Sequence, residues 1–332
     1  MAARCVRFTA PRRVDVVPVD VPEPTPGRDL LVRTEYSGIS AGTELLAYRG
    51  ELDPSTVVDE TLGGLSGTFR YPFTFGYSCV GRVEVGTAGI PAGSMVFAFH
   101  PHQDRFVVPA SDAVPLGPDT APRAATLFPL VETALQLTLD AGPVTAETVV
   151  VLGLGTVGVL TALMLTRAGA RVLAAEPRRW RRELAASVGV TAVPPEELPD
   201  RVADATGGRG TPLLVELSGA PSALAGSLVL LSHEGTALVG SWYGAKAVPL
   251  PLGAHFHRRR LTIRSSQVST IPAALQGRWN TARRRVTARD LLDELPLRAL
   301  ATTEFSFVDA AVAYAAIDRG EDGVLHAALR YQ

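Results

Sequence analysis

The most constraining stretch of the sequence is an uncharged run, VVVLGLGTVGVLTALMLT, at positions 149–166. Its length alone would suit a membrane span. Glycines divide it, however, into a short β-branched run and a run rich in Ala and Leu. This division is the pattern of a buried strand that turns into a helix. The sequence therefore predicts a strand, a glycine-rich turn and a helix at this point.

The turn itself has the pattern GxGxxG, formed by Gly153, Gly155 and Gly158. The first glycine permits a tight turn, the second lets the backbone approach a pyrophosphate, and the third lets the helix pack closely with its N–H groups facing the anion. We therefore expect a dinucleotide site here. The expected site also includes the turn residues Leu154, Thr156 and Val157.

The choice of dinucleotide depends on Glu176, which directly follows the second predicted strand of this unit, at 171–175. An acidic side chain at this place accepts hydrogen bonds from the adenosine ribose diol, which favours NAD(H). Arg178 and Arg181 come directly afterwards, and guanidinium groups suit the 2′-phosphate of NADP(H). We expect all three side chains in the site, with NAD(H) favoured and NADP(H) left open.

The regions on either side of the turn differ in pattern. Residues 1–125 show many short strands separated by Gly and Pro, which predicts a small β-barrel. Residues 126–268 alternate strands with helices, which predicts βαβ units in a doubly wound parallel sheet with helices on both faces. Residues 269–332 predict helices and a last strand. The expected fold class is therefore α/β.

Composition excludes several classes of protein. The formal net charge of −1 offers no field for nucleic acid or an anionic membrane. Cys5 and Cys79 are too few for a disulfide framework or a four-sulfur zinc site, and unbridged thiols suit a reducing compartment. The opening segment MAARCVRFTAPRRVDV lacks the apolar run of a signal peptide. We expect a soluble cytoplasmic protein, with the basic runs 258–260 and 283–285 on solvated faces.

Several segments, in their order along the chain, resemble the medium-chain dehydrogenase/reductase superfamily: YSGISAGTELL, FGYSCVGRVEVG, LVETAL, VVVLGLGTVG, ELSGAPSAL and VGSWYG followed by HRRRLTIRSSQV. The resemblance covers nearly the whole chain. The pieces SGISAGTE, PHQDRFVVP, VETAL and RSSQV are most similar to a branch that includes the bacteriochlorophyllide dehydrogenases, which oxidise a hydroxyethyl side chain. The resemblance implies a homodimer with a GroES-like barrel (1–125), a Rossmann domain (126–268) and a return segment (269–332) that completes the catalytic barrel.

The sequence departs from the zinc-dependent members of this superfamily. Where they carry a ligand cysteine this chain has Ser40, and where they carry Gly-His-Glu it has Gly76, Tyr77 and Ser78. The third ligand position falls near Phe128, which cannot bind a metal. A catalytic zinc needs three protein ligands. We therefore expect no metal site and a zinc-independent enzyme.

Without zinc, protein groups must hydrogen-bond the reacting oxygen and handle one proton. The resemblance implies a pocket between the two domains. The strongest candidate there is His102, because imidazole titrates near neutrality, although a loop histidine bonded to backbone is an equally good interpretation. Tyr77, Glu132, Ser40 and Thr43 are further candidates; Tyr77 could equally fill the space of a lost ligand, and Glu132 could be a helix N-terminal charge.

The far end of the cofactor is expected at residues that follow later strands, because ligands of such sheets bind at the carboxyl ends of strands. These residues are Ser218, Gly240, Ser241, Trp242 and, in the RSSQV segment, Gln267.

The leading hypothesis is a zinc-independent NAD(P)-dependent oxidoreductase that interconverts a secondary alcohol and a ketone on a specialised metabolite. Zinc-free members of the superfamily often reduce activated C=C bonds with NADPH, so a quinone or enoyl reductase is an alternative. A dinucleotide-binding protein without turnover is a third interpretation. In each case the expected partners are small molecules.

Overall fold

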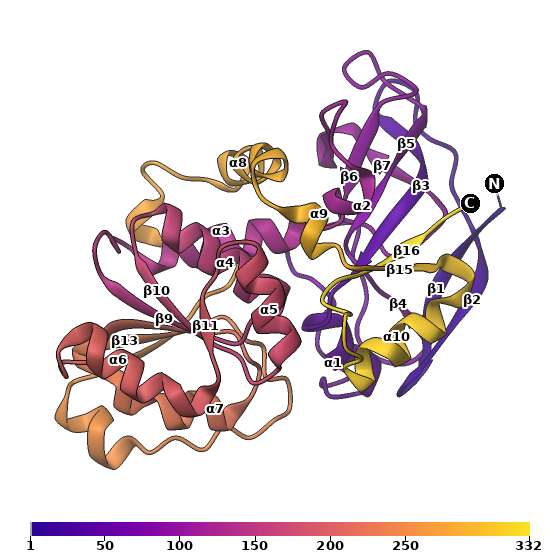
Figure 1. The fold of residues 1–332 in the computed structure, drawn as a ribbon. Coiled ribbons are helices and arrows are strands. Elements are labelled where there is room, and N and C mark those ends of the chain that lie inside the picture. Colours follow the sequence, from indigo (N-terminus) through magenta and orange to yellow (C-terminus); the bar gives the residue numbers. More distant parts are fainter. Residues whose placement is uncertain (1) are drawn as a thin grey trace. The chain divides into compact units, whose positions relative to one another are not determined.

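The computed structural model describes residues 2–332, which fold into two compact units (Figure 1). Unit 1 contains the chain up to Pro129 and again from Arg289, and unit 2 contains Leu130–Ala288. The expected boundaries were 125/126 and 268/269. The second boundary lies later, inside helix α8 (Thr281–Glu294), because Arg284 of that helix forms a buried ion pair with Glu132 of unit 2.

Unit 1 is built on strands from both ends of the chain. A three-stranded sheet has the order β2-β1-β4, and a seven-stranded sheet has the order β15-β16-β3-β5-β6-β8 with β7 paired to β3. Strand β16 pairs with β3 through Ala327 opposite Ile39, so the last segment completes a sheet begun early in the sequence. The strands are β1 (Ala2–Ala10), β2 (Arg13–Asp20), β3 (Asp29–Ile39), β4 (Phe73–Thr74), β5 (Cys79–Val85), β6 (Met95–Ala98), β7 (Arg105–Pro109), β8 (Ala113–Pro115), β15 (Thr303–Ser306) and β16 (Ala327–Arg330).

Two helices of unit 1 pack on one aromatic core. Helix α1 (Thr43–Arg49) and helix α10 (Ala310–Arg319) contribute Tyr48 and Tyr314, which stack at 5.3 Å between ring centroids. Tyr314 also meets the ring of Phe8 edge-on. The sequence had predicted strands and little helix in this region, so α1 was not expected. The short helices α2 (Pro122–Ala125) and α9 (Leu297–Leu300) also belong to this unit.

Unit 2 is the doubly wound sheet that the sequence predicted. Its strand order is β11-β10-β9-β12-β13-β14, and each neighbouring pair is parallel. The order runs outward in both directions from β9, which leaves the switch point of the topology between β9 and β12. The strands are β9 (Thr148–Leu152), β10 (Arg171–Ala175), β11 (Ala192–Val193), β12 (Thr211–Glu216), β13 (Leu231–Val239) and β14 (Thr262–Ser265).

Helices cover both faces of this sheet (Figure 1). Val150 and Leu152 of β9 pack with Leu198 and Val202 of α6 and with Leu224 of α7. Helices α3 and α4 lie on the other side of the sheet. The helices are α3 (Phe128–Ala141), α4 (Thr156–Arg167), α5 (Arg179–Ser187), α6 (Leu198–Thr206) and α7 (Pro221–Ser227).

The uncharged run 149–166 divides as expected into buried strand β9 and helix α4. Within residues 2–332, no helix combines the length and the apolar character that crossing a bilayer requires. Helix α6 and strand β14 were not expected, because LPDRVADAT is largely polar and TIRS lies where the sequence pattern becomes irregular.

Candidate cofactor and active sites

The glycine turn has the geometry that a bound pyrophosphate requires. Gly153 adopts φ +87°, and a Cβ there would lie 2.6 Å from the Cα of Ser218. A Cβ on Gly158 would lie 2.0 Å from the carbonyl oxygen of Gly153, so only glycine allows α4 to start this close to the turn. A Cβ on Gly155 would meet no atom within 4 Å. The open space at Gly155, in front of the first N–H groups of α4, fits a phosphate.

Glu176 supports this turn from the end of β10. Its side chain is buried, with Oε2 accepting a hydrogen bond from the amide of Leu154 (2.9 Å) and Oε1 accepting one from the amide of Arg178 (3.0 Å). Nη1 of Arg181 lies 3.8 Å from Oε2. The carboxylate therefore holds the turn in shape and sits beside one of the two arginines that were proposed for a 2′-phosphate.

A cavity of about 290 Å³ opens at the carboxyl edge of the sheet, beside the turn. The ends of β9 and β10 form one side of it through Gly153 and Pro177, and helix α7 forms another through Ser222 and Ala223. Its lining is mostly apolar and small-chained, which suits a flat ring system.

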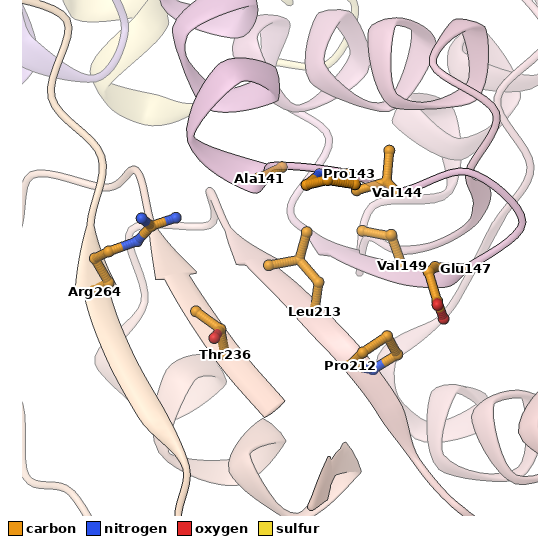
Figure 2. Close-up of a pocket in the computed structure, with 9 residues that line it drawn as sticks. All are labelled: Ala141, Pro143, Val144, Glu147, Val149, Pro212, Leu213, Thr236 and Arg264. Carbon is orange, nitrogen blue, oxygen red and sulfur yellow. The ribbon is translucent and has the colours of Figure 1, made fainter. Parts of the chain in front are cut away.

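A second hollow, of about 180 Å³, lies at the opposite edge of the same sheet (Figure 2). Figure 2 shows Val149 and Leu213, from the amino-terminal halves of β9 and β12, beside Thr236, which pairs with Leu213. Glu147 and Arg264 lie at the rim of the hollow. Ligands of open α/β sheets bind at the carboxyl ends of the strands. The hollow of Figure 2 is therefore on the wrong edge for the cofactor.

The residues expected at the far end of the cofactor lie on the loops after β12 and β13 and, for Gln267, after β14. Ser241 Oγ accepts a hydrogen bond from the amide of Gly219 (2.9 Å), and the amide of Gly240 donates to the carbonyl oxygen of Glu216 (3.0 Å). Trp242 is 47% exposed. Gln267 is also exposed, and its Oε1 accepts a hydrogen bond from the amide of Ser269.

Sequence reasoning missed the group that organises these loops. Glu216 is completely buried at the end of β12, and its Oε2 accepts a hydrogen bond from the hydroxyl of Tyr243 (2.7 Å). Burial and this carboxylate raise the pKa of Tyr243 well above its usual range. The signal available in the sequence was the position of Glu216, a charged residue directly after the apolar run LLV of β12.

In unit 1, three of the predicted catalytic residues form a cluster of hydroxyl groups. Ser40 and Thr43 lie close enough to Tyr77 for their hydroxyls to act on its pKa, which they lower, and the side chain of Tyr77 is partly buried. Burial, and next the charge of Glu44, raise the pKa of Tyr77 to about 12. Tyr77 is therefore protonated at neutral pH and able to donate a hydrogen bond to an oxygen.

His102 lies behind this cluster, in a buried chain of hydrogen bonds. Its Nε2 is 2.9 Å from Glu44 Oε2, its Nδ1 is 2.7 Å from Ser37 Oγ, and Ser37 Oγ is 2.8 Å from the hydroxyl of Tyr331. Glu44 Oε2 also accepts a hydrogen bond from Tyr314, and Oε1 accepts one from the amide of Ser40 (2.9 Å). With Nε2 as donor to Glu44, Nδ1 can accept from the hydroxyl of Ser37, and Ser37 can accept from the hydroxyl of Tyr331, so that every donor of the chain has an acceptor.

The imidazole of His102 is completely buried and both ring nitrogens are engaged. A Cβ on Gly76, which has φ +111°, would lie 2.5 Å from His102 Cδ2. The ring therefore lies directly against the backbone that leads into Tyr77. The sequence did not identify Ser37, Tyr314 or Tyr331 as partners of this cluster.

Glu132 lies in a buried ion pair of unit 2. Its Oε1 is 3.0 Å from Nε of Arg284, and Nη1 of Arg284 donates to Oε1 of Gln136 (2.5 Å). Glu132 and Arg284 are 3% and 2% exposed. The expectation that Arg284 belongs to a solvated basic face is therefore wrong. That expectation did not consider Glu132 and Gln136, which lie four residues apart on α3 and both bind Arg284.

The residues at the three zinc-ligand places do not fit a metal. Ser40 and Tyr77 belong to the hydroxyl cluster, and the ring of Phe128 packs on Phe97 at 4.5 Å between centroids. His100 stacks on Phe106 at 4.1 Å, and burial lowers its pKa to about 4. Throughout residues 2–332, no three His, Cys, Asp or Glu side chains come together as a metal site would require.

Comparisons with known proteins agree with this architecture. The zinc-binding dehydrogenase family model matches residues 156–288, a range that excludes positions 40, 77 and 128. L-threonine 3-dehydrogenase of Pyrococcus furiosus is 28% identical over 70% of this chain and 74% of its own length. The 2-desacetyl-2-hydroxyethyl bacteriochlorophyllide A dehydrogenase of Cereibacter sphaeroides is 29% identical over 51% of this chain and 54% of its own.

Among solved structures, the alcohol dehydrogenase TADH from Thermus sp. ATN1 superposes with a TM-score of 0.78 at 23% identity, covering 99% of this chain and all of that one. This likeness confirms the two-part α/β fold. Together the matches indicate that the chain is an NAD(P)-dependent oxidoreductase, and they show its similarity to the medium-chain dehydrogenase/reductase superfamily.

Proposed function

We propose that the protein is a zinc-independent oxidoreductase that prefers NAD(H) and interconverts a secondary alcohol and a ketone on a specialised metabolite. The observation that carries this proposal is that Ser40 and Tyr77, which the resemblance sets at places where zinc enzymes hold ligands, form a cluster of hydroxyl groups with Thr43. Dehydrogenase relatives support the general reaction. The cluster supports its zinc-free form.

The glycine turn and the cavity beside it would hold the cofactor, which supplies or accepts a hydride when bound. Gly155 leaves room for the pyrophosphate, and Glu176 lies where the adenosine ribose diol is expected. The carboxylate of Glu176 would repel a 2′-phosphate, which is the physical reason for the proposed NAD(H) preference.

Tyr77 is the group that we assign to the reacting oxygen. With its pKa at about 12, the hydroxyl keeps its proton at neutral pH and can hydrogen-bond a ketone oxygen. In the reducing direction it would give this proton to the alkoxide that hydride addition leaves, and solvent would restore the proton; oxidation would be the reverse. The hydroxyls of Ser40 and Thr43 lie beside that of Tyr77. A hydrogen bond aimed at the developing charge would then take the part that Lewis-acid polarisation has in zinc enzymes.

His102 and Glu44 are assigned as positioning residues, because neither has free surface for a substrate. Glu44 holds the amide of Ser40, and the ring of His102 supports the backbone at Gly76. Both therefore act through the residues of the hydroxyl cluster. The ion pair of Glu132 with Arg284 likewise supports a structural role for Glu132 in unit 2.

The proposed substrate carries a hydroxyalkyl side chain on a larger skeleton. This part rests on the relative from Cereibacter sphaeroides, whose name describes a hydroxyethyl group on a bacteriochlorophyllide.

The test combines cofactor titration with metal analysis and turnover. NADH and NADPH are titrated side by side by fluorescence against the wild type and Glu176→Gln, which removes the charge but keeps the shape. We expect NADH to bind at least tenfold more tightly than NADPH in the wild type, and this ratio to shrink in the variant. Tighter NADPH binding in the wild type would instead favour the quinone or enoyl reductase alternative.

Turnover is then followed at 340 nm with a panel of secondary alcohols and the matching ketones, before and after dialysis against a chelator. Tyr77→Phe is expected to lower kcat about 100-fold with little change in NADH affinity, because its hydroxyl acts on the reacting oxygen. One tightly held zinc per chain, or activity lost on chelation, would refute the zinc-independent mechanism.

A further inference from the structure

The loops that follow β12 and β13 are tied to the buried carboxylate of Glu216. Its Oε1 accepts hydrogen bonds from the amide of Ser218 (2.7 Å) and from the Ser218 hydroxyl. Its Oε2 accepts one from the hydroxyl of Tyr243 (2.7 Å). The two oxygens of one side chain therefore hold two different loops.

The first of these loops lies directly on the glycine turn. The Cα and the amide nitrogen of Ser218 are the atoms that a Cβ on Gly153 would meet, at 2.6 and 2.8 Å. The residue before Ser218 is also bonded to the strand that leads into the turn, because the amide of Leu217 donates to the carbonyl oxygen of Leu152 (2.9 Å). Any shift of Ser218 would therefore reach the backbone that faces the pyrophosphate.

The second loop follows β13, which lies one strand further from the switch point than β12. A dinucleotide lies across the switch point of such a sheet, with one mononucleotide over each half. Glu176 on β10 marks the adenosine half, so the strands beyond β12 face the nicotinamide half. Ser218 lines the cavity beside the turn, whereas Tyr243 follows β13 and is absent from that lining.

We propose that Glu216 is a positioning residue that braces both halves of the dinucleotide site, with Ser218 at the adenosine end of the brace and Tyr243 at the nicotinamide end. The inference rests on the proposed function only in taking the glycine turn to hold a dinucleotide. It assigns the fixed spacing between the two loops to one side chain, and it makes Tyr243 part of the cofactor site.

The chemistry of the brace suits a fixed spacing. Tyr243 stays a hydrogen-bond donor over the whole working pH range, since burial, followed by the hydrogen bond to Glu216, raises its pKa far above neutrality. The carboxylate of Glu216 accepts from both loops at once, and a hydrogen bond to a charged acceptor is stronger than a neutral one. Tyr243 therefore does not lose its proton near neutral pH.

The test compares a whole dinucleotide with its adenosine half. The dissociation constant of NADH is measured by fluorescence and that of AMP by calorimetry for the wild type, Tyr243→Phe, Glu216→Ala and the control Tyr36→Phe, a tyrosine of unit 1. We expect Tyr243→Phe to weaken NADH about tenfold and AMP less than twofold. Glu216→Ala should weaken both about tenfold or more, and the control should change neither.

Hydrogen exchange of the cofactor-free proteins provides a readout that does not depend on the ligand. Exchange should accelerate at residues 240–245 in Tyr243→Phe, and also at 217–220 in Glu216→Ala. Unchanged exchange in both segments, or equal losses of NADH and AMP affinity in Tyr243→Phe, would overturn the brace. Failure of the wild type to bind NADH or AMP with the exchange changes present would refute the dinucleotide site and leave the brace as a feature of the loops.

Discussion

Glu44 of unit 1 and Glu216 of unit 2 are both completely buried carboxylates, and each accepts a backbone amide on one oxygen and a tyrosine hydroxyl on the other. They differ in where their partners come from. The partners of Glu216 lie within 27 residues of it, whereas Tyr314 is 270 residues from Glu44. Glu44 also has His102 as a third partner. Two carboxylates with similar hydrogen bonds therefore organise different things: Glu216 holds neighbouring loops, and Glu44 joins distant segments of the core of unit 1.

The largest expected effect is on stability. Glu44→Ala leaves three buried donors without an acceptor, those of Ser40, His102 and Tyr314, and each such loss costs about 1–3 kcal/mol. We expect unit 1 to lose about 4 kcal/mol of unfolding free energy. Glu216→Ala should cost about 2 kcal/mol, because Ser218 and Tyr243 are partly reachable by water.

Urea unfolding can separate the units, because Trp180, Trp242 and Trp279 all lie in unit 2. Tryptophan fluorescence then follows unit 2, and hydrogen exchange in β3 and β16 follows unit 1. Equal losses in the two variants would remove the distinction between a core carboxylate and a loop carboxylate.

The next effect concerns binding without loss of stability. Gly155→Asp places a carboxylate where the pyrophosphate is expected, and we predict at least a 100-fold rise in the dissociation constant of NADH, about 3 kcal/mol. Gly155→Ala is the matched control, because a Cβ there meets no atom within 4 Å. We expect the dissociation constant of NADH to rise much less in Gly155→Ala than in Gly155→Asp. A large change in the tryptophan-monitored midpoint of Gly155→Asp would show that the turn is not independent of the fold around it.

The smallest effect is a difference in acid sensitivity. Burial lowers the pKa of both His100 and His326 in unit 1 to about 4. Both histidines bind fewer protons when folded than when unfolded between about pH 6.5 and pH 4, so unit 1 loses stability as pH falls through that window. We expect about 1–2 kcal/mol per histidine between pH 7 and pH 5.

In unit 2, His255 has its pKa lowered by burial and then by Arg259, but its side chain is only partly buried. Unit 2 should therefore respond less to acid. His100→Phe keeps the stacking on Phe106 and should flatten the pH profile of unit 1. A profile of the same slope in this variant would mean that other groups set the acid response.

The same contrast explains how much could be predicted from the sequence. The parallel sheet and the glycine turn depend on patterns within one short stretch of chain, such as the run from Val149 through Gly158 to Glu176, and both were predicted. Helix α1 and the hydrogen-bonded chain through His102 depend on Tyr314 and Tyr331. These tyrosines are far away in the sequence, and no local pattern predicts their contacts. Arg284 was misplaced for the same reason, since its partner Glu132 is 152 residues away.

The long separation between Glu44 and Tyr314 has a consequence for how the protein is made. At about 5–20 residues per second, a ribosome needs roughly 15–50 s to add the 270 residues between them. During that time unit 2, which is continuous in sequence, has all its strands and can fold. The early part of unit 1 is incomplete over the same period. Glu44 has no Tyr314 hydroxyl to accept from, and β3 has no β16 to pair with. Nascent unit 1 is therefore the part of this protein most exposed to chaperones and to misassembly.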